Sequence, residues 1–390
     1  MRTIYLDYNA TTPLDAGVKE VMVSALDEGW GNPSSVHHLG QRARALLDDA
    51  RDRVAATLMC KPSEIIFTSG GSESSNLALL GVARLLRDKG QHIITSRVEH
   101  SSVLRPCEYL ANNEGFDVTF LPVDSVGRVS VDSVREALRP DTILVSIMAA
   151  NNEVGTLQPF AEIGELCSDR GVLFHTDAVQ YFGKLPVSNI ADFRADLVSL
   201  CSHKFHGPKG AGLLFVKSPL LPHPIVHGAA HENSLRAGSE NLPAILGLAE
   251  AVVRFVPSPP FQLDSIAPLA NRLISGIDAI DGVSFVGDPN SSFRLLNTVA
   301  FSVFGSDSIS LLAGLDLVGI CASSGSACSS GSVNPSHVLL AMGLKKSASI
   351  SLVRFSLGRS SSSAEIDAVL AALPDIIYRS LISPVPVNSP

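Results

Sequence analysis

The lysine at position 204 follows a short apolar run and precedes a glycine-rich turn. Residues 197–200 are typical of a buried strand, and residues 201–210 read CSHKFHGPKG. An amine at such a place is costly unless it is paired or used. Desolvated near a cationic ring, it would lose its proton readily and could form a Schiff base with a carbonyl compound. We therefore interpret Lys204 as a candidate for covalent catalysis.

A second candidate site follows the apolar run at 65–67, where residues 68–74 read TSGGSES and open a helical pattern. Glycines and hydroxyls at a helix N-terminus present free N–H groups and the positive end of the helix dipole, which suits a phosphate. Gly71 and Ser72 are the candidate ligands. An ordinary strand-to-helix turn with a serine cap explains the same residues.

Three further strand ends supply polar side chains: His100, Asn152, and Asp177 with Gln180. Each alone is more often a cap or a satisfied core group. Together, a flat ring, amide groups and one carboxylate suit a planar heteroaromatic cofactor, because a fixed aspartate keeps a ring nitrogen protonated and lets the ring act as an electron sink. Ligands of open α/β sheets gather at these strand ends.

A thiol stands in the segment SSGSACSSG, residues 323–331, which is too small and too flexible to bury it. An incidental thiol on a solvated loop is one reading of Cys328, and a functional thiol is the other. None of the six cysteines of the chain forms a C-x-x-C pair, so neither a disulfide framework nor a zinc ribbon is expected. His203-x-x-His206 lacks a nearby carboxylate or cysteine pair, so no metal site is predicted.

The elements that must hold these residues follow from apolar runs separated by helical patterns. The expected strands are residues 65–67, 92–94, 118–120, 142–147, 172–174, 197–200 and 212–216. Uninterrupted apolar strands alternating with helices predict an α/β domain with a buried, mostly parallel sheet. The segment VPSPP at 256–260 breaks the pattern. Beyond it, a helix at 262–280, strands at 283–286 and 297–303 and a last helix at 364–381 predict a smaller α+β domain, followed by a loose segment at 383–386.

Composition limits the function. The chain has 390 residues, 45% hydrophobic and 17% charged, with a formal charge of −8 and no runs of basic residues. This disfavours nucleic acid and anionic membranes as partners. The start of the chain shows no apolar leader, and no stretch of eighteen apolar residues occurs, so we expect a cytoplasmic protein.

Nine strings, in order from residue 5 to 359, resemble those of the cysteine desulfurases, which are pyridoxal-phosphate enzymes of the class V aminotransferase group. They are YLDYNATTP at 5–13, GNPSS at 31–35, TSGGSES at 68–74, SIM with NNE at 146–153, HTD at 175–177, HKFHGPKG at 203–210, RAGSEN at 236–241, SSGSAC at 323–328 and RFSLGR at 354–359.

The resemblance implies the fold-type I architecture of pyridoxal-phosphate enzymes: a large domain with a mixed, mostly parallel seven-stranded sheet, and a small α+β domain built from both chain ends. We place the large domain at 16–259 and the small domain at 1–15 and 260–390. It also implies a homodimer with sites at the interface, L-cysteine as substrate, and a sulfur-acceptor protein, with iron–sulfur cluster assembly and its scaffold protein among the candidates.

The resemblance also implies roles for individual residues. Lys204 resembles the Schiff-base lysine, His100 the ring-stacking and proton-shuttling histidine, and Cys328 the nucleophile. Cofactor contacts are implied for Gly71, Ser72, Asn152, Asp177, Gln180 and His203, and for Ser239 from the neighbouring subunit. Arg354 resembles the clamp on the substrate carboxylate, with Asn32 and Asn152 nearby. A flexible Ser/Gly segment suits a thiolate that must attack sulfur and then withdraw.

One departure concerns the residue three before the lysine, where the family usually has serine and this chain has Cys201. A thiol is a poor donor to phosphate, so we expect Ser202 or backbone N–H groups to compensate. The expected activity is conversion of L-cysteine to L-alanine with a persulfide formed on Cys328. Two alternatives remain: selenocysteine lyase, favoured by WGNPSS at 30–35 and by the missing hydroxyl at 201, and a catalytically weak sulfur-relay partner of the same fold.

Overall fold

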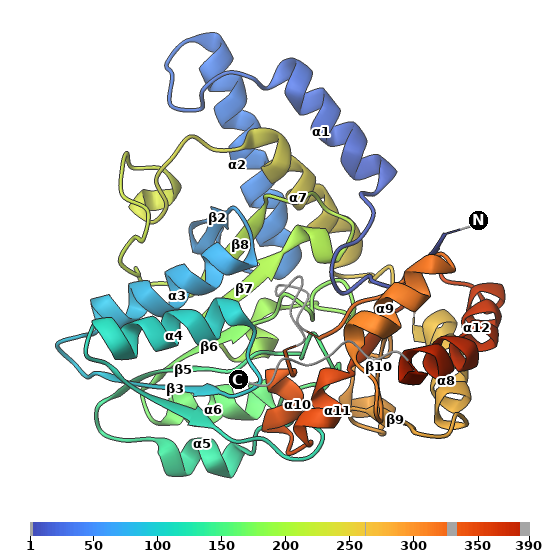
Figure 1. Ribbon diagram of the computed structural model, residues 1–390. Coiled ribbons are helices and arrows are strands. Elements are labelled where there is room, and N and C mark those ends of the chain that lie inside the picture. The colour runs from blue at the N-terminus through green and yellow to red at the C-terminus, as the bar shows by residue number, and fades with distance from the viewer. Residues whose placement is uncertain (1–2, 262, 326–333, 383–390) are drawn as a thin grey trace.

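The computed structural model describes residues 3–261, 263–325 and 334–382 (Figure 1). Its main sheet has seven strands in the order β2-β8-β7-β6-β5-β3-β4, and β8 alone runs against its neighbours. The strands are β2 (Ile65–Thr68), β3 (His92–Ser96), β4 (Asp117–Leu121), β5 (Thr142–Ser146), β6 (Leu173–Asp177), β7 (Leu197–Cys201) and β8 (Gly212–Val216). The predicted mixed, mostly parallel α/β sheet is thereby confirmed.

The strands are mostly apolar, with polar residues such as His92 and Asp117 at some strand ends, because both faces of the sheet are covered. In β2, Ile65 and Phe67 join the core on one face, whereas Ile66 joins the core on the other. The same alternation separates Ile93 from Ile94 in β3. Since successive side chains of a strand point to opposite faces, a sheet between two helical layers needs apolar residues at every position.

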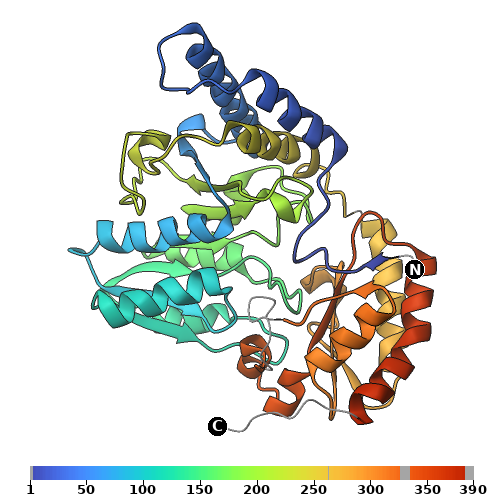
Figure 2. The ribbon, with the colours of Figure 1, turned by 45° about the horizontal axis from the view of Figure 1, so that its top comes forward.

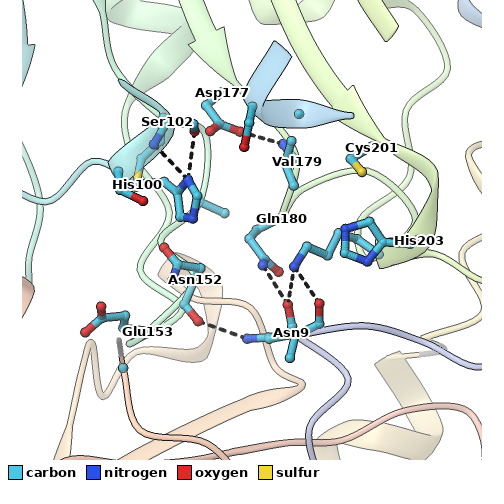
Figure 3. Close-up of a pocket in the computed structure, with 18 of the residues that line it drawn as sticks. Asn9, His100, Ser102, Asn152, Glu153, Asp177, Val179, Gln180, Cys201 and His203 are labelled. Atoms are coloured by element: carbon cyan, nitrogen blue, oxygen red, sulfur yellow. Dashed lines mark hydrogen bonds between the residues drawn. The ribbon is translucent and has the colours of Figure 1, made fainter. Parts of the chain in front are cut away.

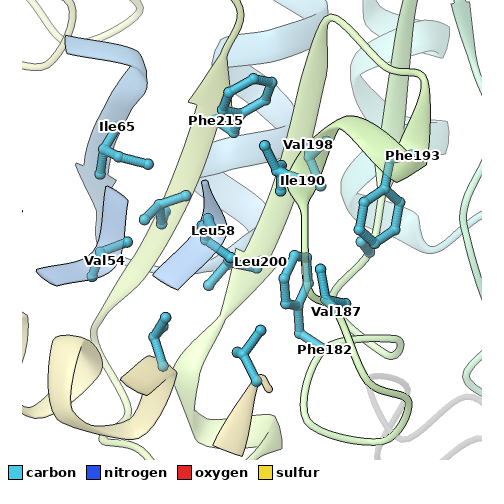
Figure 4. Close-up of a cluster of buried hydrophobic side chains, with 14 of the residues drawn as sticks. Val54, Leu58, Ile65, Phe182, Val187, Ile190, Phe193, Val198, Leu200 and Phe215 are labelled. Carbon is cyan, nitrogen blue, oxygen red and sulfur yellow. The ribbon is translucent and has the colours of Figure 1, made fainter. Parts of the chain in front are cut away.

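Two groups of helices cover this sheet. The helices are α1 (Ala16–Glu28), α2 (His38–Leu58), α3 (Gly71–Leu85), α4 (Ser101–Asn113), α5 (Val131–Ala137), α6 (Phe160–Asp169) and α7 (Leu242–Phe255). Helices α3 and α4 contribute to one core, and α2, α6 and α7 to the other. Figure 4 shows part of the second core, including Val54 and Leu58 of α2. In α2 the buried positions Ala43, Leu47, Ala50, Val54 and Leu58 recur every three or four residues, which is the helical period.

A second sheet lies beside the first, with the strand order β12-β10-β9 (Figure 2). Its elements and their neighbours are α8 (Leu263–Asp278), β9 (Val283–Val286), β10 (Thr298–Val303), α9 (Ser308–Leu317), α10 (His337–Ala341), α11 (Lys346–Ile350), β12 (Val353–Ser356) and α12 (Ser363–Ile382). The first residues of the chain join this unit, because β1 (Ile4–Tyr5) pairs in parallel with β11 (Ile320–Cys321). Ile4, Leu6 and Tyr8 share its core. The division at residues 15 and 260 stays a prediction.

Five short 3-10 helices complete the described structure: η1 (Pro62–Glu64), η2 (Ile190–Phe193), η3 (Ser202–Lys204), η4 (Glu232–Ser234) and η5 (Ser291–Phe293). Within the described ranges, no helix has the length and apolar character needed to cross a membrane. The segment 383–386, which we expected to be loose, lies outside the described residues.

Candidate active site

A cavity of about 510 Å³ lies where the carboxyl ends of five parallel strands of the main sheet meet residues of the second unit. Gly71 and Ser72 follow β2, His100 follows β3, Asn152 follows β5, Asp177 ends β6, and Cys201 ends β7. From the other side come Asn9, Gly325 and Arg354. The polar strand ends that the sequence singled out therefore do meet in one place (Figure 3).

Lys204 lies in η3, directly after β7, and its side chain lines the cavity. Its Nζ donates hydrogen bonds to the backbone carbonyls of Asn9 and Ala10, at 2.8 Å each. Burial lowers the pKa of the Lys204 amine to about 8. The unprotonated fraction of this amine near neutral pH is therefore far larger than for an ordinary lysine, and the unprotonated form is the nucleophile.

Asp177 and His100 face the same cavity from β6 and from the start of α4. The Asp177 carboxylate accepts a hydrogen bond from the N–H of Val179 at 3.0 Å, and burial raises its pKa. His100 Nδ1 accepts the N–H of Ser102 at 3.1 Å, and burial lowers the pKa of the imidazole. The neutral ring therefore carries its proton on Nε2. A carboxylate in such a place needs a cationic partner to stay ionised.

The start of α3 forms one wall of the cavity. Its N-cap is Gly70, which offers no side chain to the first N–H groups of the helix. A Cβ atom at Gly71 would lie 2.6 Å from Cγ2 of Val179, so only glycine lets the backbone pass this close. Uncapped N–H groups at a helix N-terminus form an anion site. His203 lies nearby, and burial lowers its pKa to about 4, so its ring is neutral.

Arg354 comes from β12 and is almost fully buried. Its Nη2 donates to Asp7 Oδ1 at 2.9 Å, and its Nη1 donates to the carbonyl of Asn152 at 2.7 Å. Its Nε has no hydrogen-bond partner among the described residues. The other oxygen of Asp7 accepts the hydroxyl of Ser323 at 2.9 Å, which ties Arg354 to the segment that leads toward Cys328.

One expectation is corrected by the geometry: the Ser202 hydroxyl cannot replace the missing serine at position 201. Its Oγ lies 2.6 Å from the carbonyl of Pro208 and 3.0 Å from that of Ala211, and the residue is fully buried outside the cavity lining. A hydroxyl has one proton, and here it is used inside the fold. Backbone N–H groups are left to compensate for Cys201, whose side chain does line the cavity.

Two more predicted residues, Asn32 and Ser239, do not line this cavity, and a third lies outside the described residues. Asn32 lies between α1 and α2, where its side chain accepts the N–H of Ser34 at 2.8 Å, and neither Asn32 nor Ser239 lines the cavity of the single chain. Cys328 lies outside the described residues. Gly325 and His337, which precede and follow it in the chain, both line the cavity.

The structure adds residues to which the sequence analysis gave no role. Asn9 joins Lys204 to its surroundings, and Glu153 lines the cavity and accepts the Ser336 hydroxyl at 2.5 Å. Glu99 is fully buried beside His100, and burial raises its pKa to about 8. Asn9 and Glu153 stand in strings that carried the resemblance, which was the available signal. Glu99 is adjacent in sequence to a predicted site residue.

A buried amine with a lowered pKa, a buried carboxylate and an uncapped helix N-terminus lie at one edge of the α/β sheet, an arrangement that suits covalent chemistry on an anionic carbonyl compound. The chain belongs to the class-V aminotransferase family, whose model matches residues 4–369, and within that family to the cysteine desulfurases. Pyridoxal phosphate is the cofactor of this family.

The similarity extends over almost the whole chain. This chain is 43% identical to cysteine desulfurase IscS of Dictyoglomus turgidum, and the match covers 97% of this chain and 95% of the relative. Among solved structures, a NifS-like protein superposes with a TM-score of 0.89 at 34% identity and covers 97% of this chain and 100% of its own. SspA in complex with cysteine superposes with a TM-score of 0.79 at 35% identity, covering 92% and 100%.

Proposed function

We propose that this chain binds pyridoxal phosphate in the cavity, linked to Lys204, and converts L-cysteine to L-alanine while the sulfur passes to Cys328. The observation that carries the proposal is the place of Lys204. Its side chain lines the cavity, its Nζ donates to the carbonyls of Asn9 and Ala10, and burial lowers its pKa to about 8. An aldehyde cofactor needs such an amine.

The residues present fit this cofactor. The uncapped start of α3, with Gly71 and Ser72, would hold its phosphate. Asp177 is a buried carboxylate that forms no ion pair with any described residue, although Lys204 lies close enough to favour its ionised form, and the protonated ring nitrogen would supply a direct partner. His100 would lie against the ring, with Asn152 and Gln180 near its phenolic oxygen.

When bound, the cofactor withdraws electrons from the amino acid and so weakens the Cα–H and Cβ–S bonds. The chain supplies the proton transfers. The amine of Lys204 can accept the Cα proton when it is free, because its lowered pKa makes the unprotonated form more accessible than in an ordinary lysine. His100 can donate a proton from Nε2, since its Nδ1 is held as an acceptor by Ser102.

Arg354 would orient the substrate. Both of its Nη atoms are already fixed, by Asp7 and by Asn152, and each keeps one further N–H. A guanidinium presents two parallel donors to a carboxylate, so it fixes the direction of the amino acid as well as its place. Because Arg354 is rigid and almost fully buried, little entropy is lost when the carboxylate binds.

The sulfur step requires no external oxidant. The Cys328 thiolate attacks the sulfur of the bound cysteine, an S–S bond forms, and the Cβ–S bond breaks. Its electron pair stays on Cβ, which takes up a proton and becomes the methyl group of alanine. The persulfide then passes to an acceptor protein, for which an iron–sulfur scaffold is the candidate that the relatives' group suggests. Gly325 and His337 line the cavity on either side of this segment in the chain, which supports the proposal.

We further propose a homodimer in which Ser239 reaches the cofactor phosphate of the neighbouring subunit. Ser239 does not line the cavity of its own chain. It lies near η4 in a segment rich in positive-φ residues, including Asn233 and Gly238. The dimer would complete the anion site that α3 begins.

The test is to reconstitute the purified protein with pyridoxal phosphate, add L-cysteine and a thiol reductant, and measure alanine and sulfide. The Cys328→Ser variant should lose turnover, and the matched Cys321→Ser variant should keep it, because Cys321 lies in β11 outside the cavity lining. Undiminished alanine formation by Cys328→Ser would contradict the sulfur step. Faster turnover of selenocysteine without any need for Cys328 would favour the selenocysteine lyase alternative, which Cys201 at the anion site supports.

A further inference from the structure

Lys184 carries a fully buried amine that the reaction outlined above does not use. It follows β6 in a turn, is 2% exposed, and does not line the cavity. Its Nζ forms no ion pair with any carboxylate of the described residues. Instead it donates to Asn9 Oδ1 at 2.6 Å and to Gln180 Oε1. Its other contact is the ring of Phe261, whose centroid lies 5.9 Å from Nζ. A buried amine whose hydrogen bonds go only to amide oxygens is costly, so its presence requires an explanation.

The contacts of Lys184 fix the orientation of the Gln180 amide. A backbone carbonyl only accepts hydrogen bonds, so the amide nitrogen of Gln180 must face the carbonyl of Asn9, 3.0 Å away. The amide oxygen then points away from it, and Lys184 supplies a donor at that end. Among the described residues, Lys184 is the donor to Gln180 Oε1, so without Lys184 the amide is held only by the hydrogen bond from Nε2 to the Asn9 carbonyl and its orientation is less well fixed.

Asn9 is held in the same way from its other end. Its Oδ1 accepts from Lys184 and from Asn297 Nδ2 at 3.0 Å, and its Nδ2 donates to Thr298 Oγ1 at 2.8 Å. Its backbone carbonyl receives Nζ of Lys204 at 2.8 Å. The Asn9 carbonyl thus accepts hydrogen bonds from both Gln180 and Lys204, and Lys184 contacts the side chains of Asn9 and Gln180.

We propose that Lys184 is a positioning residue: it holds the Gln180 and Asn9 side chains so that Gln180 presents its N–H donors, and Asn9 its carbonyl, beside Lys204. The proposal rests on the proposed function, because Gln180 and Lys204 serve the cofactor there. A donor at Gln180 favours the anionic form of a phenolic oxygen, whereas a rotated amide would place its own oxygen against it. Burial and the nearby Lys204 and Arg354 lower the pKa of Lys184 well below its ordinary value, yet even a neutral amine keeps two donors, one for each oxygen.

The first test needs no cofactor. The chain has five glutamines, Gln41, Gln91, Gln158, Gln180 and Gln262, so side-chain ¹⁵N spectra of glutamine-labelled apo-protein are simple. The Gln180 signals are those lost in Gln180→Glu. In Lys184→Met, which keeps the length of the chain without its donors, we expect their hydrogen exchange to quicken by about tenfold or more, since a buried hydrogen bond is lost. Gln158 is the control, because its amide is held by Gly127 and Val129.

The second test is a double-mutant cycle on the reconstituted enzyme. Lys184→Met should lower kcat by about tenfold and leave KM within about twofold, because Lys184 does not reach the substrate. In a Gln180→Ala background, the same substitution should change kcat by less than about twofold, since the group through which Lys184 acts is gone. Lys184→Gln has an amide that can still donate to Gln180, so it should recover part of the lost exchange protection of Gln180 and part of the lost kcat. It also replaces Lys184→Met in both tests if that variant does not fold.

The proposal is overturned if Gln180 exchange is unchanged in the Lys184 variants, or if kcat falls equally in both backgrounds. A purely structural role predicts that equal fall, together with loss of stability. Our account predicts that the loss in kcat depends on the presence of Gln180 whatever the change in stability, because Lys184→Met removes a buried amine but also leaves Gln180 Oε1 without its donor. If the proposed function fails, the exchange result on the apo-protein still decides this inference.

Discussion

Asp7 forms an ion pair with Arg354, which lines the cavity, and 2.9 Å separates Asp7 Oδ1 from Arg354 Nη2. The pair joins the first strand region of the chain to β12, some 350 residues later, and both side chains are largely shielded from solvent. Because Asp7 also accepts the Ser323 hydroxyl, one carboxylate sets the position of the proposed substrate clamp and of the segment leading to Cys328. The N-terminal residues are therefore part of the site.

Arg354→Lys should raise KM for L-cysteine by about 100-fold, because an ammonium cannot make two parallel hydrogen bonds to a carboxylate while also holding Asp7 and the Asn152 carbonyl. Steady-state kinetics with L-cysteine measure this. Arg359→Lys is the matched control, since Arg359 lies in the same string but pairs with Asp15 outside the cavity lining. An unchanged KM for Arg354→Lys would remove Arg354 from substrate binding.

Asp177→Asn should lower turnover by about 100-fold or more and yet make the cofactor-free protein more stable. Burial raises the pKa of Asp177 in the folded state, so folded apo-protein holds this proton at pH values where the unfolded chain has lost it. Its stability therefore falls as pH rises from about 4, the pKa of an ordinary aspartate, through the higher folded value. The Asp177→Asn variant has no carboxyl group at this position, so its stability should not show this fall as pH rises.

Urea unfolding of the apo-protein at pH 5 and pH 8 measures the difference. The gap between Asp177→Asn and the parent should widen at pH 8, whereas Asp132→Asn, at an exposed position, should show no gap. An apo-protein weakened by Asp177→Asn at both pH values would mean that the carboxylate already has a stabilising partner in the chain.

Cys201→Ser should tighten binding of pyridoxal phosphate by about three- to tenfold. The Cys201 side chain lines the cavity beside the start of α3, and a hydroxyl there can donate to a phosphate where a thiol donates weakly. Titration of the apo-protein, followed by absorbance, gives the affinity. Cys60→Ser, at a residue that does not line this cavity, is the control. Equal or weaker binding by Cys201→Ser would show that the phosphate does not approach position 201.

Gly325→Ala should reduce alanine formation by about tenfold or more. A Cβ atom there would lie 2.0 Å from Oε2 of Glu153, and Glu153 is held by Ser336, so the backbone must shift. The spectral change on cysteine binding, which needs Arg354 and not Cys328, should be retained. Ser324→Ala, one residue earlier, removes atoms and should have little effect. Full activity in Gly325→Ala would show that the chain at this point tolerates displacement.

The sequence predicted the main sheet well because its signal is local. Each of the seven strands is a short apolar run between helical patterns, and a buried parallel sheet needs such runs. The pairing of β1 with β11 could not be predicted, because each has two residues and their alignment depends on a contact across some 315 positions. The strand β12 was hidden because Arg354 interrupts its apolar pattern, and the ion pair with Asp7 is what allows a charge there.

The sequence predicts those residues of the candidate site whose side-chain chemistry and place after a strand are visible in the sequence itself. Lys204, Asp177 and His100 follow or end strands, so the fold brings them together. The Ser202 hydroxyl was one of two donors expected at the phosphate, the other being backbone N–H groups, but local carbonyls of the following turn take its proton. Lys184 gave no signal, because an isolated lysine in a sequence is usually exposed, and its burial depends on amide partners that tertiary structure supplies.

The most direct test of the central claim is to reduce the protein with borohydride after incubation with pyridoxal phosphate and to map the labelled peptide by mass spectrometry. The account predicts one pyridoxyl group per chain, on Lys204, and none in Lys204→Ala. A label on Lys184 or Lys209, or no stable label on the folded protein, would contradict it.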